Sequence, residues 1–461
     1  MNREELLFAV RVLDRSHDAA ALSHIVRHTP PSDLVDALDI LPTERVVALL
    51  MILETPLRAE LFAHFSESRQ DGLLQAMPRE AVVELFEHMP ADDRADLFNR
   101  LSDEAKAKLL PALDQAERED IIKLAAYPEG TVGSVTTSDF VQVSPTMSVA
   151  EAMAHIRATA ADKETIYIVY VVDAEHRLCG TVSLRELVLA DPAAKIGEIM
   201  RAQPVFARAN WPRTQAAELI RQYDLLALPV INGGERMIGI VTVDDAMDIE
   251  KEYDATQLAR FGGTATLGGP DLDMLASPFS RMFKVRAFWL AMLTFFGVLT
   301  STFVAAQEEI LTQVIVLAAF IAPIVDMGGN TGSQSATLVI RAMALGELEM
   351  KWRDVWFIVK RELPVAATLG AAIAVLEAVL AFFAKGVGFD VLLIVGLSML
   401  TVTALGGVIG ALLPFAARRI GTDPATLSSP LITSIMDLLG VFIYFGIAYA
   451  VLGDRLTQAA V

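Results

Sequence analysis

Five long apolar segments in the C-terminal half of this chain constrain its fold more than any other feature. They cover residues 288–306, 310–344, 355–384, 391–417 and 431–452. A helix of about 20 apolar residues crosses the hydrocarbon core of a bilayer, which is roughly 30 Å thick. We therefore predict an α-helical membrane protein whose five transmembrane helices form one domain over residues 281–461.

Basic residues flank these segments unevenly, and this asymmetry orients them. Arg and Lys residues precede the first segment, separate the second from the third, and separate the fourth from the fifth, whereas the opposite connections carry only Lys385. Loops rich in Lys and Arg stay on the cytoplasmic side. We predict a multi-pass protein of the inner or plasma membrane, with cytoplasmic N-terminal domains and the C-terminus outside.

The whole net charge of −19 lies before the membrane segments. Residues 281–461 hold 12 basic and 12 acidic side chains, so residues 1–280 hold 26 bases and 45 acids. Such a surface repels nucleic acid, and we expect no nucleic-acid partner. It fits a body that attracts cations, although acidic surfaces also serve solubility alone.

Residues 39–122 repeat with a period of 12 residues, from DILPTERVVALL to PALDQAEREDII. Most of the seven units carry Pro or Ser near the fourth position and end in two apolar residues. Proline is well tolerated in the first turn of a helix, so each unit predicts one short helix and a turn. The stack predicts a cytosolic, all-α superhelical solenoid over residues 1–130. A plain helical bundle is the alternative, and seven units in one register disfavour it.

Two copies of the order helix, strand, turn, strand and helix follow. Residues 149–158, 166–172 and 179–187 form the first copy, and 215–223, 228–231 and 239–246 form the second. The phrases GTVSLRE from Gly180 and GIVTVDD from Gly239 resemble a tandem pair of cystathionine-β-synthase (CBS) domains, here an α/β pair over residues 131–200 and 201–250. The resemblance implies an adenosine-nucleotide sensor, with ATP as the candidate ligand and Arg185 as the candidate binding residue.

An acidic helix begins at Asp244 and is followed by a Gly-rich linker. We assign residues 244–270 to this connecting helix and linker. Because it joins the predicted sensor to the first membrane segment, we expect it to transmit movement between them.

Asp437 lies inside the last apolar segment. A carboxylate at the bilayer centre costs roughly 3 kcal/mol or more, so it persists where it faces water, a partner or an ion. Two copies of the chain across a two-fold axis would place a pair of Asp437 carboxylates on one pathway. Mg²⁺ keeps several waters and is usually held by one or two carboxylates.

The second apolar segment is interrupted by Gly328, Gly329, Asn330 and Thr331. The glycines predict a break at mid-membrane, where carbonyl groups are exposed only if protein or water satisfies them, and the Asn, Gln, Thr and Ser residues favour a water-lined wall. Close helix packing by small residues explains part of the same pattern. Asp326 and Glu377 are further acids in the membrane segments, and the sequence assigns them no role.

The whole chain resembles the MgtE family of magnesium channels. The domain order carries the resemblance, together with GGNTGSQSAT from Gly328 and the phrases around Asp423 and Asp437. It implies a homodimer in the lipid bilayer with a pore on the two-fold axis, formed by residues 281–461. Asp437 is then the residue that binds hydrated Mg²⁺, and Asp423, the acid before the last span, is the second metal residue of the pore. The implied pore-lining residues are Gly328, Gly329, Asn330, Thr331, Ser429 and Thr433.

The resemblance also implies that cytosolic Mg²⁺ closes the channel by binding between the solenoid, the CBS pair and the connecting helix. The candidate ligands are Asp92, Asp93, Asp96, Asp224, Asp244, Asp245 and Asp248. The sequence departs from the family pattern at Ser429, where Asn is frequent, and at Leu225, where an aromatic residue would stack on adenine.

Two other functions stay open. One is a membrane-anchored CBS-type receptor for an ion or nucleotide, which would not need Asp437. The other is transport of a different divalent cation such as Co²⁺, although no span contains the His or Cys ligands that softer metals favour. We expect no enzyme, because the chain has no phosphate-cradling loop of the P-loop type and no Ser/His/Asp arrangement.

Overall fold

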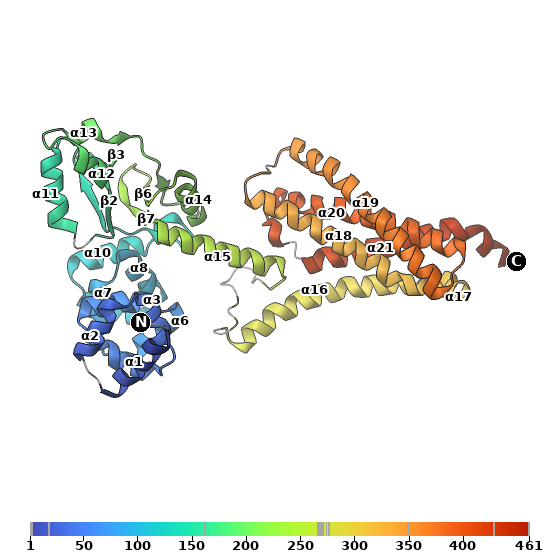
Figure 1. Cartoon of the computed structure of the whole chain (residues 1–461), viewed down its shortest axis with the longest axis horizontal. Coiled ribbons are helices and arrows are strands. Elements are labelled where there is room, and N and C mark those ends of the chain that lie inside the picture. Colours follow the sequence, from blue (N-terminus) through green and yellow to red (C-terminus); the bar gives the residue numbers. More distant parts are fainter. Residues whose placement is uncertain are drawn as a thin grey trace. The chain divides into compact units, whose positions relative to one another are not determined.

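The computed structural model describes residues 3–16, 19–160, 163–264, 272, 274, 277–348, 350–426 and 429–459. Two compact units make up the chain, Met1–Tyr253 and Asp254–Val461. Figure 1 draws the first in blue to green and the second in light green to red. Part of the predicted linker before residue 270 lies outside the described residues.

The first unit begins with short helices whose starts follow a strict 12-residue period after α1 (Arg3–Ser16). They are α2 (Ala19–His28), α3 (Pro31–Leu38), α4 (Thr43–Leu50), α5 (Thr55–Ala63), α6 (Glu67–Ala76), α7 (Arg79–His88), α8 (Ala91–Arg100), α9 (Asp103–Leu109) and α10 (Gln115–Leu124). The predicted solenoid is confirmed, and its period starts two helices earlier than the sequence pattern indicated.

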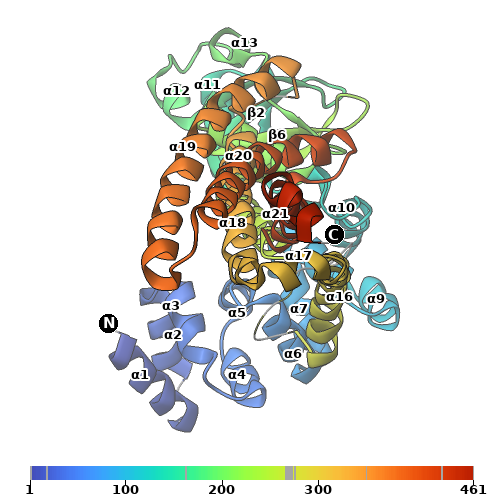
Figure 2. The same ribbon diagram turned by 90° about the vertical axis from the view of Figure 1, so that its right-hand side faces the viewer.

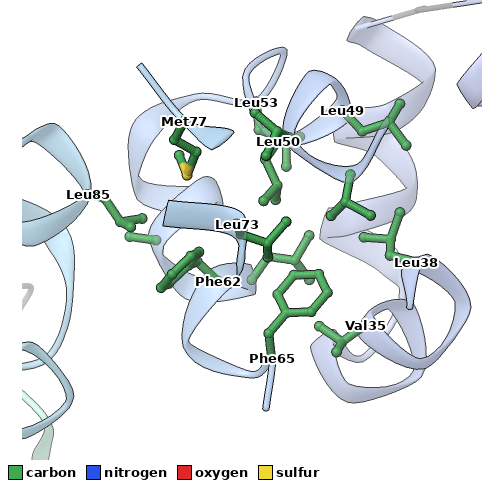
Figure 3. Close-up of a cluster of buried hydrophobic side chains, with 14 of the residues drawn as sticks. Val35, Leu38, Leu49, Leu50, Leu53, Phe62, Phe65, Leu73, Met77 and Leu85 are labelled. Carbon is green, nitrogen blue, oxygen red and sulfur yellow. The ribbon is translucent and has the colours of Figure 1, made fainter. Parts of the chain in front are cut away.

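Alternate helices of this solenoid pack against each other, as α3 does with α5, α4 with α6 and α5 with α7. Their apolar side chains meet in one continuous core. Figure 3 shows Leu50, Phe62 and Leu73 among these side chains, and all three are fully buried. The apolar residues of each unit thus join its helix to the stack; α4, for example, buries Val46, Val47, Leu49 and Leu50.

Buried polar side chains connect successive solenoid helices at a fixed position. Arg58, the fourth residue of α5, donates to the carbonyl oxygens of Leu50 and Leu53 at 3.2 and 3.1 Å. Gln70 donates to that of Phe62 at 3.3 Å, and Arg94 to that of Phe86 at 3.4 Å. Because the last carbonyls of a helix have no partner within it, these side chains complete the preceding unit.

The rest of the first unit forms two small α/β modules. The elements of the first are β1 (Phe140–Val143), α11 (Val149–Thr159), β2 (Thr165–Val172), β3 (Leu178–Ser183), α12 (Leu184–Leu189), α13 (Ile196–Ile199) and β4 (Arg201–Ala202). Those of the second are β5 (Ala207–Arg208), α14 (Arg213–Tyr223), β6 (Ala227–Ile231) and β7 (Met237–Thr242). The first module has the sheet order β1-β2-β3-β4, with β1 parallel to β2 and β2 antiparallel to β3; the second has the order β5-β6-β7.

The connecting helix α15 (Val243–Phe261) follows β7 without a loop. All residues of β7 are buried, which fixes the start of the helix. The carboxylate of Asp245 accepts hydrogen bonds from the Thr242 hydroxyl at 2.6 Å and from the Thr242 backbone N–H at 3.3 Å. These bonds occupy groups at a helix N-terminus that would otherwise lack partners, and they hold Asp245 in the first turn.

The second unit contains five helices, within the described residues, that are long and apolar enough to cross a membrane. They are α16 (Phe279–Ala305), α18 (Ala318–Ala344), α19 (Trp352–Lys385), α20 (Phe389–Arg419) and α21 (Ser429–Ala459), with the short helices α17 (Glu308–Gln313), η4 (Ile315–Leu317) and η5 (Pro424–Thr426) between them. The predicted five-span fold is confirmed. The second span starts later than predicted, because residues 308–313 form the separate helix α17.

Helix α20 packs against α18, α19 and α21, as the end-on view in Figure 2 shows. Gly328 and Gly332 on α18 meet Gly406 and Gly410 on α20. This spacing of small residues lets two backbones approach closely. The predicted break in α18 is therefore wrong: the helix is continuous from Ala318 to Ala344, and its glycines serve packing.

Candidate functional site

A stripe of polar side chains follows one face of α18 and stays uncovered by its own chain. Asp326, Asn330, Gln334 and Thr337 are exposed, each three or four residues after the last. The Asn330 amide donates to the Asp326 carboxylate at 2.9 Å. Because helix positions at this spacing share a face, the stripe runs along the helix and carries a fixed carboxylate at membrane depth.

Helix α21 continues the stripe with a second carboxylate. The Ser429 hydroxyl lies 3.1 Å from the Ser333 hydroxyl of α18, and the Thr433 side chain lies against Gly329. Asp437 follows one turn deeper, is half-buried, and is close enough to Asp326 for their charges to interact. We call Asp326, Asn330, Ser333, Ser429, Thr433 and Asp437 the polar seam.

Three residues predicted to line the pore are not on the exposed surface of this seam. Gly328, Gly329 and Thr331 are buried against neighbouring helices, and the Thr331 hydroxyl donates to the Met327 carbonyl oxygen at 2.8 Å. A Cβ added at Gly329 would lie 2.8 Å from the Thr433 side chain. Asn330 is a predicted residue of α18 that does face outward, whereas Asp326 and Gln334 are recognisable as its neighbours on that face only once the rotation of the helix is known.

Asp423 lies in the loop between α20 and α21, where its two oxygens have different partners. Oδ1 accepts from the backbone N–H of Ala425 at 2.9 Å. Oδ2 accepts from the Gln257 amide at 2.9 Å and from the Arg260 guanidinium. Gln257 and Arg260 belong to the last turns of α15, so Asp423 ties the end of that helix to the start of the last span.

A second group of acids lies in the first unit, where α8 approaches the start of α15. The charges of Asp92 and Asp93 on α8 interact with that of Asp245, and Asp244 also acts on Asp93. Glu164, just before β2, interacts with Asp93, Asp244 and Asp245. We call Asp92, Asp93, Glu164, Asp244 and Asp245 the acidic cluster.

Burial and mutual repulsion raise the pKa values of these acids. Loss of hydration, followed by the charge of Asp245, raises the pKa of Asp92 well above its usual value and that of Asp93 to about 6. Partial burial and the charges of Asp244 and Asp245 raise the pKa of Glu164 to about 7. The cluster therefore resists carrying its full negative charge and favours any bound cation or proton.

The remaining predicted sensor acids have different surroundings. Asp96 is one turn after Asp92 on α8, and burial raises its pKa to about 7. Asp248 acts on Asp245 from the next turn of α15. Asp224 is exposed at the end of α14, where its φ of 50° is left-handed. Among the described residues, the charge interactions that join α8 to α15 do not include Asp224.

Two acids of these sites cannot be assigned from the sequence. Asp326 is recognisable there only as a membrane acid, because its link to Asp437 depends on the packing of α18 against α21. Glu164 stands outside any motif, and only the fold places it beside α15. Arg185, the candidate nucleotide residue, is exposed in the first turn of α12.

Neither the polar seam nor the acidic cluster forms a complete metal-coordination site. Within the part of the chain that the structure describes, no three His, Cys, Asp or Glu side chains converge to hold an ion directly. Mg²⁺ dehydrates reluctantly and usually keeps several waters. Spaced carboxylates are suited to an ion that keeps its water shell.

Three family models match successive parts of the sequence. The model of the MgtE intracellular N domain matches residues 29–130, that of the CBS domain matches 132–192 and 196–252, and that of a divalent cation transporter family, MgtE, matches 321–447.

Relatives match over most of the chain. The magnesium transporter MgtE of Thermus thermophilus is 33% identical over 96% of this chain and 98% of its own length. That of Bacillus subtilis is 30% identical over 74% of this chain and 73% of its own. A crystal structure of the cytosolic domain of the Mg²⁺ channel MgtE in complex with ATP is 34% identical, with a TM-score of 0.50 over 53% of this chain and 99% of that one. The soluble part of a magnesium transporter is 28% identical, with a TM-score of 0.52 over 55% and 99%.

Proposed function

This chain belongs to the MgtE family of magnesium transporters, and on that premise we propose that it works as a homodimeric, Mg²⁺-selective channel with its pore on the two-fold axis. It is a multi-pass membrane transporter and not an enzyme. We further propose that it mediates magnesium uptake, that its C-terminus lies outside, and that cytosolic Mg²⁺ closes it.

The observation that carries the pore proposal is the pair of carboxylates on the polar seam. Asp326 is exposed and Asp437 is half-buried in a single chain, although both lie in membrane-spanning helices. Charged groups at this depth are costly unless they face water or a partner. A second copy placed against the seam would enclose a polar passage and bring four carboxylates to it.

Such a passage suits a hydrated divalent cation. Rings of Asp or Glu are a common route to cation selectivity. Asp437 is the proposed Mg²⁺-binding residue, and Asp326, oriented by Asn330, adds charge beside it. Ser429 and Thr433 offer hydroxyl groups to the ion's waters, while Gly328, Gly329 and Thr331 support the wall from behind. Asp423 would meet the ion at the cytoplasmic end.

The acidic cluster supports the gating proposal. Without a bound cation, Asp92 and Asp93 on α8 repel Asp245 on α15, and this repulsion favours separation of the solenoid from the CBS pair. Bound Mg²⁺ would reverse the sign of the interaction and hold the two together. To shift the equilibrium from 1:99 to 99:1, the ions must favour the closed form by about 5.5 kcal/mol in total.

A nucleotide at the CBS pair is a separate proposal. A related cytosolic domain was crystallised with ATP, and its sequence is 34% identical to this chain. Arg185 on α12 offers a cation for phosphate, while Leu225 lacks an aromatic face for adenine. We propose ATP as a modulating ligand here, which equilibrium binding with Arg185→Ala as the comparison tests.

The transport proposal is tested by Mg²⁺ uptake into proteoliposomes. We expect Asp437→Ala to abolish the flux, because it removes the central carboxylate, and Asp437→Glu to retain a measurable part of it. Unchanged flux in Asp437→Ala would exclude this pore. A wild-type protein that binds Mg²⁺ but transports none would favour a membrane-anchored CBS-type receptor. Faster uptake of Co²⁺ than of Mg²⁺ would favour a transporter of another divalent cation.

A further inference from the structure

We propose that Arg260 is a built-in counter-ion of Asp423, so that a cation reaches this carboxylate only when the last turn of α15 withdraws. The inference rests on the proposed transport function, in which Asp423 meets the ion at the cytoplasmic end. When the channel is shut, the positive charge bound to Asp423 is the Arg260 guanidinium of the same chain, in place of a metal ion.

The geometry satisfies Asp423 without any ion. Oδ1 is held by the Ala425 backbone N–H, and Oδ2 by the Gln257 amide and the Arg260 guanidinium. The Arg260 and Asp423 side chains are only 34% and 25% exposed. An arriving Mg²⁺ must therefore displace two donors, and one of them is a full positive charge.

The arrangement favours Arg260 over a free ion for two reasons. A guanidinium is weakly hydrated and presents several N–H donors, whereas Mg²⁺ gives up its waters reluctantly. Arg260 is also tethered, so its local concentration at Asp423 far exceeds that of a dissolved cation. The pair is nonetheless partly exposed to water, which keeps it weak enough to open.

Helix α15 gives this pair a regulatory position. Arg260 is the last residue but one of α15, while Asp244 and Asp245 of the acidic cluster lie in its first turn. One continuous helix thus carries cation-sensing carboxylates at one end and a cation at the other. Movement of α15 changes both ends together, so Mg²⁺ binding to the cluster would decide whether Arg260 stays on Asp423.

The experiment compares Mg²⁺ flux at permissive and inhibitory internal Mg²⁺ for the full-length wild type, Arg260→Gln, Arg260→Lys, and Lys251→Gln as a control on the same helix. The measured quantity is the ratio of inhibited to permitted flux, which cancels differences in protein amount. We expect Arg260→Gln to raise this ratio by roughly tenfold, which corresponds to about 1.4 kcal/mol. Arg260→Lys should restore part of the closure, and Lys251→Gln should match the wild type.

A double variant shows whether Arg260 and Asp423 act on closure through their contact or independently of each other. If the two side chains act together, the double variant Arg260→Gln/Asp423→Asn should have the same ratio of inhibited to permitted flux as Asp423→Asn alone, because either change alone breaks the pair. Additive effects, or normal closure of Arg260→Gln, would overturn the proposal.

A second readout keeps this test independent of transport. In a Cys179→Ser background, which removes the only native cysteine, Arg260→Cys and Asp423→Cys are treated with a short thiol cross-linker. A 260–423 cross-link within one chain supports the contact, and its absence overturns it. If the wild type carries no Mg²⁺ flux, the proposed function fails while the cross-link still decides the contact.

Discussion

The backbone of Gly406 on α20 lies directly against that of Gly328 on α18. A Cβ added at Gly406 would lie 2.5 Å from the Gly328 carbonyl oxygen, a distance that no real side chain tolerates. This contact fixes the rotation of α18. With Gly328 turned inward, Asp326 and Asn330 face outward, so a packing contact between two glycines sets the composition of the polar seam.

Substitution of Gly406 by Ala tests that contact. The added methyl must push α18 and α20 apart, and overpacking of this kind costs about 1–3 kcal/mol. We expect a lower unfolding temperature for the purified protein in detergent. Gly446→Ala on α21 is the matched control, because a Cβ there meets nothing within 4 Å. Equal unfolding temperatures for the two variants would mean that the contact does not hold the helices together.

The buried arginines of the solenoid lead to a second prediction. Replacing Arg58 by Met keeps much of its bulk but removes its hydrogen bonds to the carbonyl oxygens of Leu50 and Leu53, and leaves the Leu50 oxygen with only the Leu53 backbone N–H as a donor. Buried groups left unpaired cost about 1–3 kcal/mol. Urea unfolding, followed by hydrogen exchange in the solenoid helices, should show a loss of that size.

Arg27→Gln provides the comparison for Arg58→Met. Arg27 pairs with Glu54 at 3.2 Å, but the two side chains are 56% and 72% exposed. Exposed ion pairs contribute about 0–1 kcal/mol, so this change should have little effect. An Arg58→Met variant as stable as Arg27→Gln would contradict the role of the buried donors.

Periodic features of the sequence predicted most of the fold. The 12-residue repeat places each solenoid helix, because the apolar residues of each unit recur at the same positions, and segment length alone places the five spans. Which side chains of a helix face its neighbours and which face outward is harder to predict. Gly328 and Asn330 are two residues apart in one polar stretch, and only packing against α20 turns the first inward and the second outward.

The family resemblance implied that acids of α8 and α15 meet, but two other contacts between distant segments were not predictable from any motif. The position of Glu164 beside Asp244 and the hydrogen bonds from Gln257 and Arg260 to Asp423 join segments far apart in the chain. The local sequence around each of these residues does not indicate the contact. These are also the contacts on which regulation is proposed to depend.

The acidic cluster predicts a pH dependence. Unfolded Asp and Glu have pKa values near 4, whereas Asp93 and Glu164 reach about 6 and about 7 in the fold. Between these values the folded state holds protons that the unfolded chain has lost. In the absence of Mg²⁺, the free energy of unfolding of the cytosolic part should therefore fall as pH rises from about 4 to 7, and level off above that.

Thermal unfolding of the full-length protein in chelator, measured across this pH range, checks that sign. Asp93→Asn combined with Glu164→Gln should flatten the dependence, and saturating Mg²⁺ should flatten it as well. Stability that rises with pH in chelator would contradict the raised pKa values.

A variant of Asp326 tests the polar seam while Asp437 stays intact. Because Asp326 adds negative charge beside Asp437, Asp326→Asn should lower Mg²⁺ flux severalfold at low external Mg²⁺ and less at saturation. Glu377→Gln changes another membrane acid, on α19, and should leave the flux unchanged. Concentration-dependent uptake of the two variants measures the difference. Equal effects would remove Asp326 from the proposed pathway.

The most direct test of a watery passage along the seam is cysteine accessibility in a Cys179→Ser background. Single cysteines replace Thr433 on the seam and Phe442, an exposed apolar residue further along α21. A charged, membrane-impermeant thiol reagent should label the cysteine at position 433 under permissive Mg²⁺ and block the flux, and should leave the one at position 442 unlabelled. Labelling at 442 but not at 433, with flux unaffected, would contradict a pore lined by Asp326 and Asp437.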